Sequence, residues 1–530
     1  MPVRCRGNAT TNALTVRICA SDTRALNGGM LLIGLSGPAK GGAMTAALQA
    51  SSGVTAELAE FVVATSCDRL PASVVHATKR LILDTMSCAI GAVDTAPGRL
   101  LLEYKRSAGG RADSTLLASG TKVPCGSAAY AHSQLANVLD ADEVTLWMHS
   151  AAAVVMPAIA AAEFSGADGA SLVAAVATGF ELAARVGMSL PTFRVDPATG
   201  LLRSPGADSI GFSWASYGAA AAVGKLLDLD AATIAEAFGI AQVSMPVHGA
   251  LSYVGHSEPW HKYAMFAAIG EAGVNAAMLA ARGFRADGRL FDAGSTFFRA
   301  MNAADSDRAV MLDGLGSRWA VESTSLKPWP GSRLMHTALG AFTDLVAEHQ
   351  LRPDDIRSVT VVVPPWPIIE WQASKVECTD RFQIMSSLPY LMSMIAYGVP
   401  AGPAWWSEAA FGNPAMRAFA QRVTARVDPD LNEVFLADLR AGLQFNVSRV
   451  PVQVRIETAD AILTRYVERA HGDPADPSTA MTDAELAAKS EEFTRDVLPA
   501  GAGQQLVAAA FSLDKAGNLD ALMGPCTDHA

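Results

Sequence analysis

From Thr55 to Ala320 the sequence is a long succession of predicted helices, and this feature most constrains the fold. Apolar residues recur at three- and four-residue spacing in segments such as AELAEFVVATSCDRL and GASLVAAVATGFELAARVGMSL, the periodicity of helices with a buried face. Pro191 cannot continue the second of these helices, and Asp230 can cap the helix that follows the break LDLD. We therefore expect a large all-helical domain whose first part spans residues 51–322.

The pattern changes after Trp319. The stretch IRSVTVVVPP is rich in β-branched residues and ends in two prolines, and VPVQVRIE alternates at Val452, Val454 and Ile456, so both predict strands. Residues 323–471 are expected to form a smaller α+β domain with an antiparallel sheet. The expected fold class is therefore mainly α, with a smaller α+β domain.

The two ends of the chain carry weaker signals. Residues 1–50 show little periodicity and predict a poorly ordered extension. Residues 472–515 have helical spacing and are expected to return to the helical domain, with 516–530 as a tail. No tandem repeat is visible.

Composition narrows the possible functions. The net charge of −11 and the pI of about 5.4 argue against a nucleic-acid partner, which requires a basic face. No apolar run reaches the roughly 18 residues of a membrane span, so we expect no membrane partner and a cytoplasmic protein. The seven cysteines are dispersed without a CxxC pair, which argues against disulfides, a zinc site or an iron–sulfur cluster: Cys5, Cys19, Cys67, Cys88, Cys125, Cys378 and Cys526.

The first candidate for chemistry is the segment LDADEVTLWMHSAAA. Asp140, Asp142, Glu143 and His149 precede an apolar helix that Ser150 can cap, which leaves His149 beside the positive end of the helix. Taken alone, the segment is better explained as a polar loop with a capping residue.

The second candidate is SEPWHKYAMFAAIG. It places His261 and Lys262 among aromatic residues at the start of an apolar helix. A lysine whose stem covers aromatic rings explains this segment equally well.

The third candidate is SLKPWPGSRLMHTALGA, at the predicted domain boundary. Lys327 and Arg333 flank a proline-rich turn, and His336 lies on the helix after it. Clefts between domains are common ligand sites, although a solvated linker would have the same composition. Together the three segments fit a site for a small polycarboxylate, because lysine and arginine bind carboxylates and histidine, lysine or aspartate transfers protons.

These segments, with FQIMSSLPYLMSMIAYG, resemble in order the MmgE/PrpD family from about Ala56 to Val497. The family includes 2-methylcitrate dehydratases, cis-aconitate decarboxylase and an iminodisuccinate epimerase. The resemblance implies that the α+β domain is a lid, that the chain forms a homodimer, and that the site lies between the domains. It also implies that the site needs no metal or other cofactor.

The resemblance also suggests residue roles. The implied catalytic residues are Asp140, His149, Lys262, Lys327 and Tyr390. The substrate-binding residues would be Asp142, Ser209, His261, Arg333 and His336.

The sequence departs from the family pattern at three positions. The family's DFDDT is DADEV here, which places Glu143 where the family has aspartate. Ser209 aligns with a family histidine, and Ser332 stands where cysteine is frequent. Serine cannot replace imidazole as a base near neutral pH, so the Ser209 position bears directly on the chemistry.

The leading hypothesis is a cofactor-free lyase, a dehydratase or decarboxylase, that acts on a 2-methylcitrate-like or cis-aconitate-like acid. His149, oriented by Asp140, would transfer the proton, and the cationic side chains would hold carboxylates and stabilise enolate-like charge. Two alternatives remain. An isomerase or epimerase needs no leaving-group acid and would tolerate serine at Ser209, and a member without catalysis would act as a binding dimer.

Overall fold

The structure is a computed structural model that describes residues 53–145, 149–190, 194–195, 202–203, 212–246, 260, 265–295, 297–300, 308–440 and 449–527. The predicted disordered extension, residues 1–50, lies outside the described residues.

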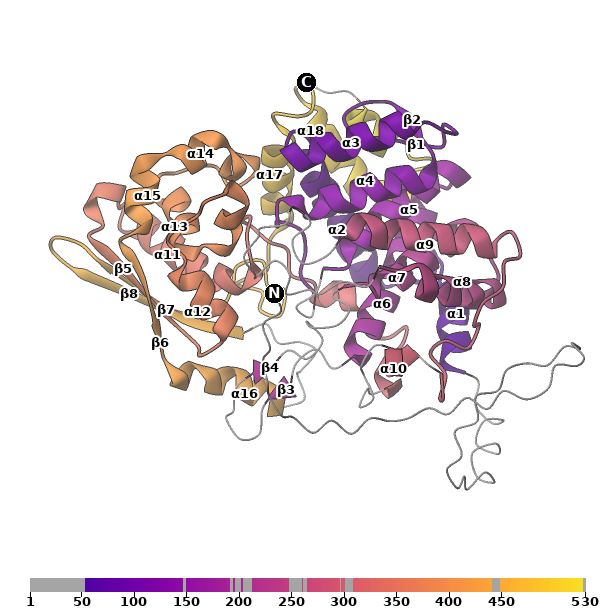
Figure 1. Cartoon of the computed structure of the whole chain (residues 1–530), viewed down its shortest axis with the longest axis horizontal. Coiled ribbons are helices and arrows are strands. Elements are labelled where there is room, and N and C mark those ends of the chain that lie inside the picture. The colour runs from indigo at the N-terminus through magenta and orange to yellow at the C-terminus, as the bar shows by residue number, and fades with distance from the viewer. Residues whose placement is uncertain are drawn as a thin grey trace, which may run out of the picture. The chain divides into compact units, whose positions relative to one another are not determined.

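The N-terminal half consists of helices with two short strand pairs, β1–β2 and β3–β4 (Figure 1). The elements are α1 (Val54–Ala64), α2 (Ala72–Gly91), α3 (Ala96–Ala108), β1 (Ser114–Thr115), β2 (Lys122–Val123), α4 (Cys125–Val138), α5 (Ala151–Ser165), α6 (Gly169–Ser189), β3 (Arg194–Val195), β4 (Leu202–Arg203), α7 (Ala215–Leu226), α8 (Ala231–Ser244), α9 (Phe266–Ala280) and α10 (Phe297–Ala300). As predicted, Asp230 caps α8 by accepting a hydrogen bond from the Thr233 N–H, and α6 ends before Pro191.

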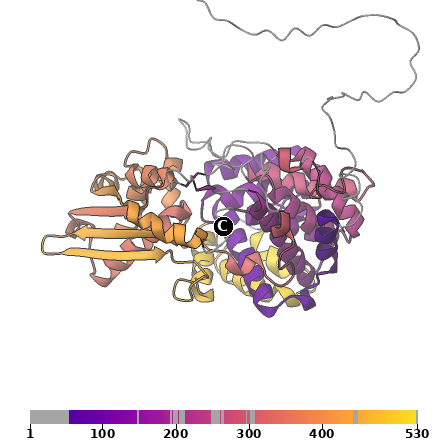
Figure 2. The ribbon, with the colours of Figure 1, turned by 90° about the horizontal axis from the view of Figure 1, so that it is seen from below.

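The second half contains a four-stranded sheet, and its strands lie side by side in Figure 2. The elements are α11 (His336–Glu348), β5 (Ser358–Val363), α12 (Pro367–Ser374), α13 (Leu388–Ala396), α14 (Glu408–Gly412), α15 (Pro414–Ala420), β6 (Val423–Val427), α16 (Asn432–Arg440), β7 (Arg449–Glu457) and β8 (Ile462–Arg469). Helix α11 packs against β7 and β8, and α12 against β5 and β6.

The sheet differs from the expected antiparallel arrangement. Its strand order is β6-β5-β7-β8, and β5 pairs antiparallel with β7 but parallel with β6. The sheet is therefore mixed, because the edge strand β6 follows a helical crossover from β5 and so runs in the same direction. The predicted fold class, mainly α with a smaller α+β domain, is confirmed. The prediction that the sheet is antiparallel was wrong, because β5 and β6 are parallel.

The chain then returns to the first helices. Helices α17 (Asp483–Thr494) and α18 (Ala502–Phe511) pack against α2, and α19 (Asp520–Met523) packs against α18. Figure 1 shows these yellow helices among the indigo and purple ones. The domain boundaries proposed from the sequence stay a prediction.

Helix α6 is long and apolar enough to cross a membrane, but 89% of its apolar window is buried inside the protein. It also carries Glu181 and Arg185, whose Oε1 and Nε atoms lie 2.6 Å apart in a buried ion pair. These features are typical of a core helix. The cytoplasmic location stays a prediction.

Glycines set the close approach of α6 and α7. A Cβ added to Gly179 would lie 2.6 Å from the carbonyl oxygen of Gly218 and 2.8 Å from Cβ of Ala222. Gly179→Ala is therefore expected to destabilise the protein by about 1–3 kcal/mol, because the two helices must separate to accept the methyl group. Differential scanning calorimetry of the full chain measures the change.

Gly412→Ala is the matched control, since its added Cβ meets no atom within 4 Å at the end of α14. We expect little change for this variant. Equal losses for both substitutions would show that close packing is not the cause.

Candidate functional site

The loop between α4 and α5 binds a buried lysine of the linker, the segment 324–335 that leads into α11. Asp140 adopts a left-handed backbone conformation with φ 53°, which aspartate tolerates better than most residues. Nζ of Lys327 donates to the Asp140 carboxylate at 2.6 Å and to its carbonyl oxygen at 3.0 Å. The same carbonyl accepts the Gly331 N–H at 3.0 Å. Asp140 and Lys327, both predicted to belong to the site, therefore form a buried ion pair.

Further contacts hold this loop against the linker. Val144 and Ser325 form an isolated antiparallel bridge, with N···O distances of 2.9 and 3.0 Å. The hydroxyls of Thr145 and Thr324 lie 2.7 Å apart. The two segments, far apart in sequence, thus share one hydrogen-bonded framework.

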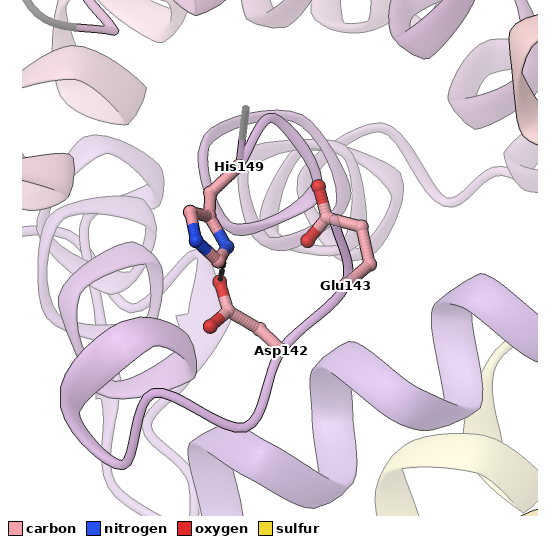
Figure 3. Close-up of side chains that lie close together, drawn as sticks. All are labelled: Asp142, Glu143 and His149. Atoms are coloured by element: carbon pink, nitrogen blue, oxygen red, sulfur yellow. Dashed lines mark ion pairs between the residues drawn. The ribbon is translucent and has the colours of Figure 1, made fainter. Parts of the chain in front are cut away.

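His149 lies against Asp142, as Figure 3 shows. Its Nδ1 is 3.3 Å from Oδ2 of Asp142, whose two oxygens each accept from Nδ2 of Asn137 at 2.9 Å. The sequence hypothesis gave the orienting role to Asp140. The structure gives that place to Asp142, because Lys327 binds the Asp140 carboxylate on the linker side.

The surroundings of His149 favour the neutral imidazole. Burial lowers the pKa of His149, although the nearby Asp142 carboxylate acts in the opposite direction. The ring also packs edge-on against Phe212, with centroids 6.0 Å apart. A neutral imidazole beside a carboxylate can accept a proton and then be stabilised as imidazolium.

Glu143, rather than Ser150, caps α5. The Ser150 side chain makes no capping bond, whereas Oε1 of Glu143 accepts the backbone N–H groups of Ser150 and Ala151 at 2.7 and 2.8 Å. Oε2 of Glu143 has no hydrogen-bond partner in the part of the chain that the structure describes. Glu143, the residue that departs from the family pattern, thus caps α5 from seven and eight residues upstream of the N–H groups it binds.

Glu143 predicts a pH effect on stability. Burial, followed by the charge of Asp142, raises the pKa of Glu143 well above its usual value, against the two backbone hydrogen bonds. A raised folded-state pKa gives stability that is complete below the unfolded pKa of about 4.3 and is lost as the pH rises through the folded pKa. Glu143→Gln stays neutral and keeps the Oε1 acceptor. Its melting temperature relative to wild type is therefore expected to increase from pH 5 to pH 8.

Glu485→Gln is the control of opposite sign. Burial opposes the shift, but hydrogen bonds from Thr482 and the interaction with His471 lower the pKa of Glu485. Its contribution is present above the unfolded pKa and lost as the pH falls. Glu485→Gln should lose stability at neutral pH and match wild type in acid. If the melting temperatures of both variants, relative to wild type, changed with pH in the same direction, the raised pKa assigned to Glu143 would be contradicted.

Asp142, Glu143 and His149 also place one ligand atom each within 4.8 Å of one another. This set of one imidazole and two carboxylates is of a kind that binds transition metals. However, both Asp142 oxygens accept hydrogen bonds from Asn137 and Oε1 of Glu143 accepts two from backbone N–H groups. These bonds engage both oxygens of Asp142 and one oxygen of Glu143 in hydrogen bonds within the protein. That the protein needs no metal stays a prediction.

Arg333 and His336 follow Lys327 in sequence; Arg333 is half-buried and His336 is buried. Arg333 donates to the carbonyl oxygen of His471 at 3.0 Å and to Oγ of Ser325 at 2.5 Å. Burial lowers its pKa to about 10, so it is protonated at neutral pH. The structure thus shows Arg333 joining the linker to the end of the α+β domain, and its carboxylate-binding role stays a prediction.

His336 begins α11 and is neutral, because burial, followed by Arg333 and Lys327, holds its pKa well below the usual value. Its Nε2 lies 3.2 Å from the carbonyl oxygen of Gly331 and therefore carries the proton. His336 thus fixes the turn whose Gly331 N–H binds Asp140.

Tyr390 lies in α13, and its hydroxyl donates to the carbonyl oxygens of Ala410 and Phe411. The structure thus shows it anchoring α14, whereas its catalytic role is untested. Ser209, His261 and Lys262 lie outside the described residues.

Two buried residues that the sequence hypothesis missed adjoin the loop. Lys489 of α17 donates to Asp84 of α2 and to the carbonyl oxygen of Ala141, each at 2.6 Å. A lone aspartate within the apolar stretch LILDTMSCAI was the available signal for Asp84. The sequence offered no comparable signal for Lys489, because its helix contains several other charged residues and a lysine there does not stand out.

The fold and this loop together define a protein with a large helical domain and a smaller α+β domain. The N-terminal domain of the MmgE/PrpD family matches residues 56–308, and the C-terminal domain of that family matches residues 329–514. The chain therefore belongs to the MmgE/PrpD family, which confirms the resemblance seen in the sequence. A comparison with curated proteins finds no match.

Proposed function

We propose that the protein is a cofactor-free lyase, a dehydratase or decarboxylase, that acts on a small di- or tricarboxylate. The observation that supports this most is the His149–Asp142 pair beside the Lys327–Asp140 pair, where the α4–α5 loop of an MmgE/PrpD chain meets the linker. The loop offers a proton acceptor, and the linker offers an ammonium bound to the same loop. The proposed substrates resemble 2-methylcitrate or cis-aconitate.

In the proposed dehydration, neutral His149 takes the proton from the carbon next to a carboxylate. The electron pair forms the new C=C bond as the C–O bond breaks, and the hydroxyl group accepts the proton that His149 has taken and leaves as water. In the decarboxylation, the C–C bond breaks, CO2 leaves, and the electron pair stays on the carbon as enolate-like charge. His149 takes a proton from solvent and transfers it to that carbon. Both reactions pass through enolate-like charge that a nearby ammonium stabilises.

Lys327 would provide part of that stabilisation. Its ammonium has three N–H donors, and the two bonds to Asp140 leave one for a substrate carboxylate. Lys262 is proposed as the second cation, and Arg333 as an anchor of the linker that carries Lys327.

An isomerase or epimerase on the same fold is the second candidate. It is favoured by Ser209, which stands where the family pattern has histidine, because removal and return of one proton needs no acid for a leaving group. Both proposals include a homodimer. The third hypothesis is a homodimer that binds a ligand without catalysing a reaction.

One experiment separates these candidates. The purified full chain is incubated in D2O with 2-methylcitrate, citrate, cis-aconitate and a panel of chiral dicarboxylates, and followed by proton NMR. Net loss of water or CO2 supports the lyase. Deuterium exchange at one carbon without elimination supports the isomerase, and ligand-induced thermal shifts without any product would leave only the binding dimer.

His132→Gln is a suitable control in the same assay. His132 is a buried histidine of α4 whose Nε2 accepts the Leu117 N–H at 3.1 Å, and no hydrogen bond or ion pair joins it to the described residues of the loop. Turnover per folded molecule is expected to match wild type.

A further inference from the structure

A buried ion pair lies behind the loop that carries Asp140 and Asp142. Nζ of Lys489 in α17 is 2.6 Å from Oδ1 of Asp84 in α2, and the two side chains are 4% and 0% exposed. The ammonium also lies 5.2 Å from the ring centroid of Phe493. The pair therefore joins helix α17, late in the sequence, to the early helix α2 through a buried contact.

The same ammonium binds the loop directly. Lys489 donates to the carbonyl oxygen of Ala141 at 2.6 Å, and Lys327 donates to the preceding carbonyl, that of Asp140, at 3.0 Å. Two lysines from distant parts of the sequence thus hold two consecutive peptide groups. Because Ala141 separates Asp140 from Asp142, this restraint fixes the backbone from which both carboxylates project.

Stability does not account for such a pair. Removing two charges from water costs several kcal/mol per ion, and apolar side chains of similar volume are often as stable or more so. Oδ2 of Asp84 also has no hydrogen-bond partner among the described residues, which adds to the cost. A hydrogen-bonded charge does, however, restrain geometry in a way that an apolar contact cannot.

The ion pair Lys79–Asp514 offers a comparison, because it joins α2 to the C-terminal segment without binding the loop. Nζ of Lys79 lies 2.6 Å from Asp514 and 2.8 Å from the carbonyl oxygen of Phe511. The pair is partly exposed, and Lys79 makes no hydrogen bond or ion pair with the described residues of the Asp140–Asp142 loop. Lys489 differs from Lys79 by its full burial and by its bond to Ala141.

We propose that Lys489, held by Asp84, is a positioning residue that sets the orientation of Asp140 and Asp142 and, through Asp142, of His149. The role of the loop in catalysis rests on the proposed function, whereas the restraint on the loop does not. Lys489 itself is not assigned any contact with substrate.

The test compares full-chain Lys489→Met, the apolar pair Asp84→Leu/Lys489→Met, and the control Lys79→Met. Hydrogen–deuterium exchange is followed at the loop amides of Asp140 and Val144, which bond to Asn137 and Ser325 in the native state. We expect Lys489→Met to raise exchange there by at least about tenfold. The apolar pair should regain the melting temperature but not the protection, and Lys79→Met should exchange like wild type.

Turnover provides the second measurement, with whichever acid of the NMR panel the wild type converts. Lys489→Met and the apolar pair should lose kcat by about tenfold or more with little change in KM, because misplaced reacting groups slow the chemical step more than binding. Lys79→Met should keep both constants.

Two results would overturn the proposal. Wild-type exchange at the loop in Lys489→Met would show that the ammonium does not restrain it. Full recovery of both protection and kcat in the apolar pair would show that only packing matters. If the wild type converts no acid, the proposed function fails, and the exchange measurement still decides the restraint.

Discussion

Lys327→Met is expected to lower the free energy of unfolding by about 3–5 kcal/mol, because it leaves the Asp140 carboxylate buried without its counter-ion. The Lys327 side chain is 0% exposed and that of Asp140 is 6% exposed, so water cannot replace the ammonium. Calorimetry and chemical denaturation of the full chain measure the loss. Lys327→Arg should also be destabilising, since a planar guanidinium does not fit the place of a compact ammonium.

The double variant Asp140→Asn/Lys327→Met distinguishes charge from packing. It removes both charges, so it should recover part of the stability that the single variant loses. Turnover should remain low, because the proposed cation at the site is absent. A double variant as unstable as Lys327→Met would mean that the loss came from packing around the lysine stem.

His149→Gln is expected to reduce turnover by about 10²–10⁴-fold, the usual contribution of a positioned general acid or base. Its effect on stability should be small, because the glutamine amide can still face Asp142. Circular dichroism and the melting temperature verify the fold.

The pH dependence of the wild type gives a second check on His149. Burial lowers the pKa of His149, so the neutral base is present at neutral pH. The acid limb of kcat/KM should therefore fall below the usual histidine pKa of about 6.5. An acid limb that persists unchanged in the residual activity of His149→Gln would assign it to another group.

The helical domain could be predicted because its signals are local. Apolar spacing, Asp230 at the start of α8 and Pro191 after α6 each act within a few residues. The edge strand β6 was missed because it is short and mostly exposed, so its sequence lacks the apolar alternation that marked β7. Its parallel pairing depends on the crossover, which the sequence of the strand does not encode.

The candidate site was predictable in its residue types but not in its pairing. Asp140, Asp142, His149 and Lys327 stood out as polar groups in apolar or turn-rich segments, and the structure brings all four together. Which aspartate faces which partner depends on the left-handed turn at Asp140 and on the linker. The cap of α5 was assigned to Ser150 from adjacency, whereas Glu143 reaches the same N–H groups through space.

The return of α17 to α2 has a consequence for biosynthesis. Domains generally fold in the order in which they leave the ribosome, but the Asp140–Asp142 loop receives its second lysine only from position 489. A nascent chain can therefore assemble most of the described helices while the loop still lacks one of the two lysines that bind it. The loop becomes fully restrained only after residue 489 has emerged, which ties maturation of the site to the synthesis of α17.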